Sequence, residues 1–198
     1  MTCGAPSPLF ARLLSWCGSW TCLALGVAWG FAEGTLWFIV PDLIITFAAV
    51  FSVKQSLRQI GAVLAGSLAA GMVMYWLGAQ HAAAARNLVA AVPFVSAHMT
   101  AVVDAGFARD GVWSMLHGPL SGIPYKVYAV YAPSYVALLP FVLVSVPARL
   151  MRLVASWALF AAGGALARRW IAAWPRAALV VYALYWSAVY AWYWFAIS

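Results

Sequence analysis

The sequence has few charged residues. Of its 198 residues only four are acidic and eleven basic, 8% of the chain in all, whereas a soluble domain carries about 25%. Hydrophobic residues make up 67% and aromatic residues 16%. So few charges cannot cover the surface of a globule of this size in water, which excludes a soluble enzyme. The composition predicts one polytopic membrane domain over residues 1–198.

Long basic runs and metal-ligand spacings are also missing. The net charge is +7, but the basic residues are scattered from Arg12 to Arg176 and form no RNA-binding signature, which excludes a nucleic-acid partner. In a membrane protein an excess of basic residues reflects contact with anionic lipid headgroups or the preference of basic loops for one side of the membrane. Cys3, Cys17 and Cys22 lie near the N-terminus without His or acidic neighbours at metal spacing. We therefore predict no zinc site, no disulfide framework and no cofactor.

Four apolar segments are long enough to cross a membrane, and polar stretches separate them. Lys54 and Arg58 are expected to mark a loop, and residues 78–110 are expected to lie at the surface as a short amphipathic helix. A second loop is expected to hold Arg168, Arg169 and Arg176. Together with Lys54 and Arg58 these three would lie on one side of the membrane, and Arg12, Arg86 and Arg109 on the other. The four segments are residues 13–31, 60–77, 135–165 and 179–197.

Two further apolar stretches are broken at their middle. Residues 35–51 contain Pro41, and residues 111–133 contain Gly122 and Pro124. Proline lacks a backbone donor and disfavours helix at the residue before it, so each stretch is predicted to form two short arms around a turn. Non-helical backbone at membrane depth is tolerated only where protein buries it or water reaches it. Each stretch is therefore interpreted as a re-entrant hairpin that lines a cavity.

Both halves of the chain have the same order of elements. Each has a broken hairpin with a charge, followed by a long span, and matching interrupted segments indicate an inverted repeat with a site where the hairpins meet. The predicted fold is all-α and integral to the membrane. It has about four transmembrane helices and two opposed re-entrant helical hairpins.

Two carboxylates lie outside the polar stretch, Glu33 and Asp42. A charged side chain at the centre of a membrane helix costs about 2.5–3.5 kcal/mol on insertion scales, so such residues tend to be functional. Burial favours the neutral form of a carboxylate, so a change of partner could release or capture a proton. The functional interpretation is a proton-coupling pair. The structural alternative is that each caps a helix end or pairs with an arginine.

Three cations supply the opposite charge. Arg149 and Arg152 are three residues apart and share a helix face, and Lys126 follows the second hairpin break. Guanidinium groups bind phosphate oxygens through two parallel hydrogen bonds, which favours a lipid phosphate as the ligand. The alternative is that the arginines reach the interface or permanently neutralise Glu33 and Asp42.

Three motifs occur in order along the chain. They are Phe31-Ala32-Glu33-Gly34 leading to Val40-Pro41-Asp42, Ser121-Gly122-Ile123-Pro124-Tyr125-Lys126-Val127, and Arg149-Leu150-Met151-Arg152. Together they resemble the motifs of the DedA family, also called the SNARE-associated or VTT-domain family, and are closest to its YqaA-like branch. The resemblance covers about residues 28–169 and leaves a C-terminal transmembrane helix at about 177–197 outside it. It implies an integral membrane fold with two opposed re-entrant hairpins, and movement of lipids between leaflets that is often linked to the proton gradient.

The function expected from these features is lipid translocation in the plasma (cytoplasmic) membrane. The substrate would be a phosphate-bearing lipid such as polyprenyl phosphate or a phospholipid, and membrane lipids and protons would be the partners. One alternative is a proton-coupled transporter of small ions or cations, and another is a membrane assembly or homeostasis factor that transports nothing; a homo-oligomer is left open. An enzyme is not expected. Ser121-Gly122 lacks the Gly-x-Ser-Gly of an intramembrane serine protease, and no histidine follows His117.

Overall fold

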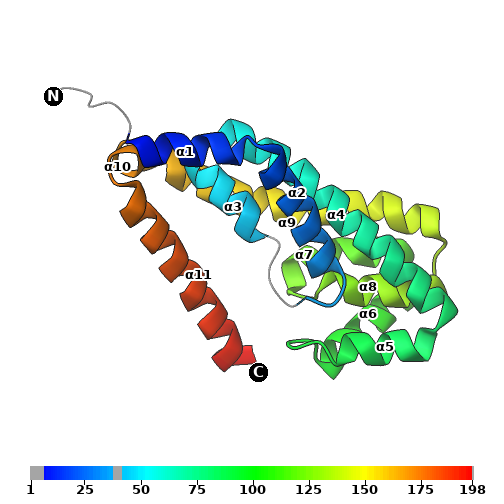
Figure 1. Ribbon diagram of the computed structural model, residues 1–198. Helices are drawn as coiled ribbons and strands as arrows, with labels where there is room; N and C mark the ends of the chain where they lie inside the picture. Colours follow the sequence, from blue (N-terminus) through cyan, green and yellow to red (C-terminus); the bar gives the residue numbers. More distant parts are fainter. Residues whose placement is uncertain (1–6, 38–41, 198) are drawn as a thin grey trace.

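The computed structural model describes residues 7–37 and 42–197, and within these ranges every regular element is helical (Figure 1). The all-helical prediction is therefore confirmed for this part of the chain. Two helices, α4 and α9, are long and apolar enough to cross a membrane. The bent pair α1 and α2, with 58° between its members, would make a third span.

The helices follow one another with short connections. Two elements, η1 and η2, are 3₁₀-helices, and the others are α-helices. In chain order they are α1 (Pro8–Cys17), α2 (Trp20–Gly34), α3 (Asp42–Phe51), α4 (Val53–Gln80), α5 (Ala82–Ala90), α6 (Ala97–Asp110), η1 (Gly111–His117), α7 (Gly118–Ser121), α8 (Tyr125–Tyr131), η2 (Ala132–Ser134), α9 (Leu138–Leu166), α10 (Arg168–Ala173) and α11 (Pro175–Ile197).

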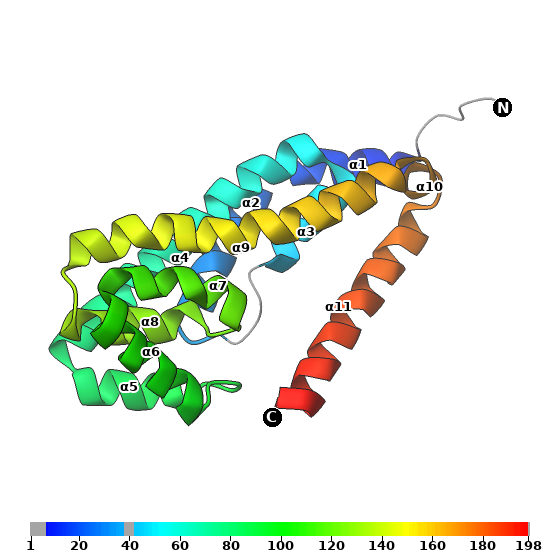
Figure 2. The same ribbon diagram turned by 180° about the vertical axis from the view of Figure 1, so that it is seen from behind.

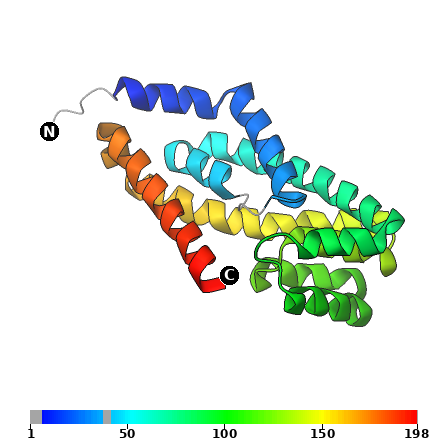
Figure 3. The same ribbon diagram turned by 60° about the horizontal axis from the view of Figure 1, so that its bottom comes forward.

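The two long helices form the frame of the molecule. Helix α2 packs along α4, and α3 packs against both α4 and α9. Helices α5 to α8 gather at one end of this frame, as Figures 1 and 2 show. Their core is built around α8, whose residues 125–130 are all buried. Helix α11 leaves the other end of α9 through α10 and runs back at an angle to it (Figure 3).

Helices α2 and α4 approach so closely that only glycine fits at their contact. A Cβ atom at Gly30 would collide with the carbonyl oxygen of Val63, and one at Gly66 with that of Val27. Small residues at such contacts are what allow membrane helices to pack. Gly66 thus faces α2, whereas a Cβ atom at Gly61 on the same helix meets only open space.

We expect Gly66→Ala to lower the free energy of unfolding by about 1–3 kcal/mol, because the added methyl group forces two backbones apart. Thermal and denaturant unfolding in detergent micelles measures the loss. Gly61→Ala is the matched control, and it should be neutral or stabilise by up to about 1 kcal/mol as a glycine-to-alanine change in a helix. Equal effects of the two substitutions would contradict the close α2–α4 contact.

Several predicted boundaries are wrong. Lys54 and Arg58 do not mark a loop, because α4 begins at Val53 behind the N-cap Ser52, whose hydroxyl accepts from the Gln55 amide. At 28 residues α4 exceeds the roughly 20 needed to span a bilayer, so its charged first turns extend beyond the apolar length. Residues 78–110 hold two helices, α5 and α6, instead of one. The expected basic loop is likewise helical, since Arg168 and Arg169 begin α10 and Arg176 belongs to α11.

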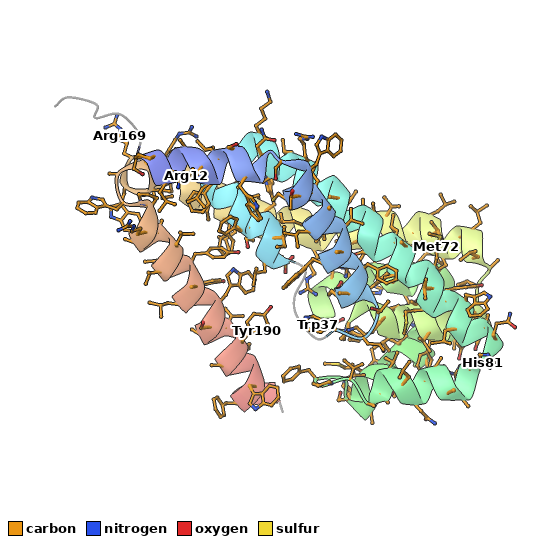
Figure 4. All side chains as sticks on the ribbon, in the orientation of Figure 1. Arg12, Trp37, Met72, His81, Arg169 and Tyr190 are labelled. Atoms are coloured by element: carbon orange, nitrogen blue, oxygen red, sulfur yellow. The ribbon has the colours of Figure 1, made fainter. Side chains whose placement is uncertain are left out.

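Arg12 also lies at the end opposite to the predicted one. It lines a pocket together with Trp174 and Arg176, so it belongs with the basic residues of α10 and α11. Figure 4 shows Arg12 and Arg169 at one end of the molecule and His81 at the other. The fold of α1 back toward α10 places Arg12 there, and charge counting could not detect that.

The second expected break is visible in the backbone. Helix α7 ends at Ser121, Gly122 adopts a left-handed conformation with φ +74°, and α8 begins after Pro124. Proline suits this position because the first turn of a helix needs no amide donor there. In the first stretch, α2 ends at Gly34 and α3 begins at Asp42, while Pro41 lies outside the described residues.

Candidate functional site

A buried ion pair joins α2 to the middle of α9. Glu33 lies in the last turn of α2, and the Arg149 Nη2 atom is 2.6 Å from the Glu33 Oε2 atom. A second contact, from Nη1 to Oε1, measures 3.4 Å. The two side chains are only 5% and 7% exposed. This paired geometry is the strong form of a guanidinium–carboxylate contact.

Two further elements complete the surroundings of Arg149. Nη2 of Arg149 also donates to the Ser67 hydroxyl of α4 at 2.9 Å. On α8, the ring of Tyr125 lies 5.0 Å from the guanidinium carbon, within the range of a cation–π contact. The Tyr125 hydroxyl donates to Ser145, which is one turn before Arg149 on α9. Four helices therefore meet at one guanidinium group.

A second, looser ion pair lies one turn further along α9. The Arg152 Nη2 atom is 3.4 Å from the Asp42 Oδ2 atom at the first residue of α3. The Arg152 side chain is 28% exposed, whereas that of Asp42 is 7% exposed. Among the described residues, neither Oδ1 of Asp42 nor Nε of Arg149 has a hydrogen-bond partner, although both atoms are buried. The network is thus only partly satisfied, which is costly in an apolar interior.

Lys126 joins the same cluster from α8. Its ammonium group donates to the Trp37 backbone carbonyl at 2.6 Å, and its side chain is buried. Lys126 also interacts electrostatically with Glu33 and Arg149. In Figure 4, Trp37 lies just beyond the end of α2, at the middle of the molecule. The structure therefore brings all five predicted charged residues into one region, which we call the charge cluster: Glu33, Asp42, Lys126, Arg149 and Arg152.

Each cation of the charge cluster has a protein partner. The adjoining cavity measures about 20 Å³, and about 10–15 Å³ is enough for one water molecule. It has no room for a phosphate headgroup while both pairs are closed. Its lining includes Met115, Gly118, Tyr125, Tyr128, Arg149 and Arg152.

Sequence reasoning missed three contributors to the charge cluster. Ser67 lies among small residues that indicate only packing, although a serine there could have been flagged as a donor. Tyr125 belongs to the Ile-Pro-Tyr-Lys string, but nothing in the string predicts that its ring covers Arg149. The Trp37 carbonyl is a backbone group, so no side-chain pattern could have indicated it.

The remaining acids lie elsewhere. On the exposed surface of α6, Arg109 donates to Asp110, and this hydrogen bond lowers the pKa of the Asp110 carboxyl group. Asp104 accepts from the Tyr135 hydroxyl. Within residues 7–37 and 42–197, no three His, Cys, Asp or Glu side chains are grouped so that they could hold a metal ion. The charge cluster is therefore the candidate site.

Compared with known proteins, the chain matches no family model, no curated protein and no solved structure. The resemblance to the DedA family thus rests on the three motifs alone. The function has to be argued from the geometry of the charge cluster.

Proposed function

We propose that the protein is a multi-pass protein of the plasma membrane that moves a phosphate-bearing lipid between leaflets in a proton-linked cycle. The observation that carries this proposal is the pair of arginines inside the apolar length of α9, of which Arg149 is buried and Arg152 is half-buried. Buried ion pairs add little stability compared with well-packed apolar residues. A partly satisfied ionic network in a membrane helix is therefore better explained by a ligand or a transported ion.

The membrane topology belongs to the same proposal. The four spans are the bent pair α1 and α2, then α4, α9 and α11. The two hairpins are the segment around α3 and the segment formed by α7 and α8. In this topology Asp42 and Lys126 stand at the hairpin breaks, where Asp42 pairs with Arg152 and Lys126 donates to the Trp37 carbonyl.

The chemistry proposed for the charge cluster is an exchange of anions. A phosphate oxygen has the same charge and bidentate geometry as a carboxylate, so it can replace Glu33 or Asp42 on the arginines. Protonation of a carboxylate weakens its hold on the arginine and frees the guanidinium group for phosphate. When the carboxylate loses its proton again, it competes the phosphate away. The closed pairs then correspond to the empty carrier, which agrees with the small cavity beside them.

A second candidate function has one observation in its favour. Every cation of the charge cluster has a protein partner, and this would also suit permanent neutralisation in an assembly or homeostasis factor. Leaflet exchange separates the two functions, because permanent pairs contribute only to folding. A transporter of small cations differs again, since it would need the carboxylates but not the arginines.

The test is leaflet exchange in reconstituted vesicles. Purified protein is placed in phosphatidylcholine vesicles that contain a fluorescent polyprenyl phosphate or phospholipid, and exchange is followed by chemical quenching of the outer leaflet. Arg152→Gln removes the more exposed cation of the site and is expected to slow exchange at least about tenfold, since a charge-assisted contact is worth about 1.5–3 kcal/mol.

Arg109→Gln is the matched control. It removes one arginine of an exposed ion pair outside the charge cluster, and exposed pairs contribute only about 0–1 kcal/mol, so exchange should not change. Unaltered exchange in both Arg152→Gln and Glu33→Gln would refute lipid translocation by this site. A small-cation transporter would be favoured if Glu33→Gln alone abolished transport and Arg152→Gln retained cation flux.

A further inference from the structure

An apolar groove runs between α9 and α11, away from the charge cluster. Its volume is about 340 Å³, within the range of about 300–1,000 Å³ found for ligand pockets. Hydrophobic side chains and small residues form nearly all of its walls, and the side chains with polar groups are two tyrosines and Trp170. Its lining includes Val50, Leu159, Phe160, Gly163, Tyr182 and Tyr185.

The groove opens toward the outside of the helix bundle. Leu159 on α9 is 68% exposed and Val181 on α11 is 57% exposed, so both rims face outward. The floor is closed, because Gly164 packs against the backbone of Val50 on α3. Gly163 differs from Gly164, since a Cβ atom placed there meets nothing within 4 Å. A side chain at position 163 would therefore fill part of the groove without displacing a neighbour.

Two helix faces connect the groove to the charge cluster. On α9, positions 152, 156, 160 and 163 are spaced by four, four and three residues, so Arg152 and Gly163 share one face. At 1.5 Å per residue they are about 16 Å apart along the helix. On α3, Asp42, Thr46 and Val50 are likewise spaced by four.

Tyr182 lies at the junction of these faces. Its hydroxyl is 2.9 Å from the hydroxyl of Thr46, one turn from Asp42, and its ring lines the groove. Along this face of α9 the residues thus change from charged at Arg152 to apolar at Phe160 and Gly163. A ligand that matches it has an anionic end and a hydrocarbon end.

We propose that this groove holds a hydrocarbon chain of the lipid whose phosphate contacts Arg152. The proposal rests on the proposed function and adds the binding site of the chain. A hydrocarbon chain can leave the bilayer and enter the groove without a cost in transfer free energy, because lipid tails are as apolar as the side chains that line the groove. The groove selects the lipid by the shape of its chain and by the distance between chain and phosphate. The arginines select the lipid by the charge of its headgroup.

The experiment labels the groove with a photoreactive lipid. Wild-type protein is reconstituted in phosphatidylcholine vesicles with a trace of phosphatidic acid that carries a diazirine in one acyl chain, and adducts are located by mass spectrometry. A diacylglycerol with the same chain serves as the phosphate-free probe. We expect phosphatidic acid to label Leu159 and Val181 well above Leu143, an exposed residue of α9 outside the groove, whereas diacylglycerol labels all three alike.

A graded series of substitutions fills the groove: Gly163→Ala, Gly163→Leu and Gly163→Phe. Labelling of Leu159 by phosphatidic acid should fall with side-chain size, by at least about tenfold for leucine, as expected when a hydrophobic pocket is occupied. The same series at Gly61, which is also open on the surface of a membrane-length helix, should leave labelling unchanged. The smaller members test the proposal even if Gly163→Phe does not fold.

The outcomes separate this proposal from the proposed function. Equal labelling by both probes, or no change across the Gly163 series, would overturn the groove as a chain site, even if Arg152→Gln slows leaflet exchange. Groove labelling that depends on phosphate and on Gly163, with exchange unaffected by both Arg152→Gln and Glu33→Gln, would support the chain site and refute translocation by the charge cluster. Protection of Leu159 from both probes, with crosslinking between copies, would show that a second copy covers the groove.

Discussion

Arg149→Met is expected to lower the free energy of unfolding by about 3–5 kcal/mol, because it leaves the buried carboxylate of Glu33 without its cation. Methionine keeps most of the volume and apolar character of the arginine stem, so the loss reports the missing charge rather than a cavity. It also removes the donor to Ser67 on α4. Unfolding by denaturant in detergent micelles, followed by tryptophan fluorescence, measures the change.

A double-mutant cycle supplies the control. The double variant Glu33→Gln with Arg149→Met replaces both charges. It should recover most of the lost stability, because a neutral pair of similar volume replaces a buried ionic pair at little cost. Arg109→Gln on the exposed surface should change stability by less than about 1 kcal/mol. Additive effects of Glu33→Gln and Arg149→Met would mean that the two residues are not partners.

The same double variant carries the second prediction. Glu33→Gln with Arg149→Met is expected to fold and yet to lose leaflet exchange by about tenfold or more, because the guanidinium group that would hold the phosphate is gone. If the pair is permanent and structural, the double variant should fold equally well but its exchange should be unchanged. The measurement is the quenching assay in phosphatidylcholine vesicles, with the amount of folded protein checked by gel filtration.

A charge-swapped variant sharpens this comparison. Glu33→Arg with Arg149→Glu keeps one cation and one anion in the charge cluster but moves the cation from α9 to α2. If phosphate binding needs a cation beside Arg152, exchange should stay low even where the swapped pair restores stability. Exchange at the wild-type rate in a folded swapped variant would contradict the proposed role of Arg149.

The residues of the charge cluster come from segments that are far apart in the chain. Their charged side chains nevertheless meet within one network, which supports the proposal of a single site. The contact between Lys126 and a backbone carbonyl at the end of α2 adds a third link between these segments.

The helical segments were largely predictable, and their ends were not. The span expected at residues 135–165 corresponds to α9 (Leu138–Leu166), since a long apolar run can bury its backbone in a membrane only as a helix. The start of α4 was missed because charged residues such as Lys54 are as acceptable on an exposed helical turn as in a loop. Helix ends depend on local caps, here Ser52, which a hydropathy pattern does not contain.

The charged residues of the site could be selected from the sequence, but which of them pair with one another could not. The rarity of charge in an apolar chain was enough to select Glu33, Asp42, Arg149 and Arg152, because each is expensive at its position. Their spacing indicated that the arginines share a face, but not that Arg149 turns to α2 and Arg152 to α3. In the structure the carboxylates contact the guanidinium groups, and the cavity that Arg149 and Arg152 line measures about 20 Å³.

The sequence by itself determined the class of the protein, its helical content and the few charges worth attention, since these follow from composition and from the cost of charge in hydrocarbon. Only the tertiary structure decided which charges pair, that Ser67 and Tyr125 join them, and that an apolar groove lies between α9 and α11. The physical reason is that pairing and cavities depend on contacts between residues distant in the chain. Helical periodicity constrains one helix face at a time and contains no information about what lies opposite.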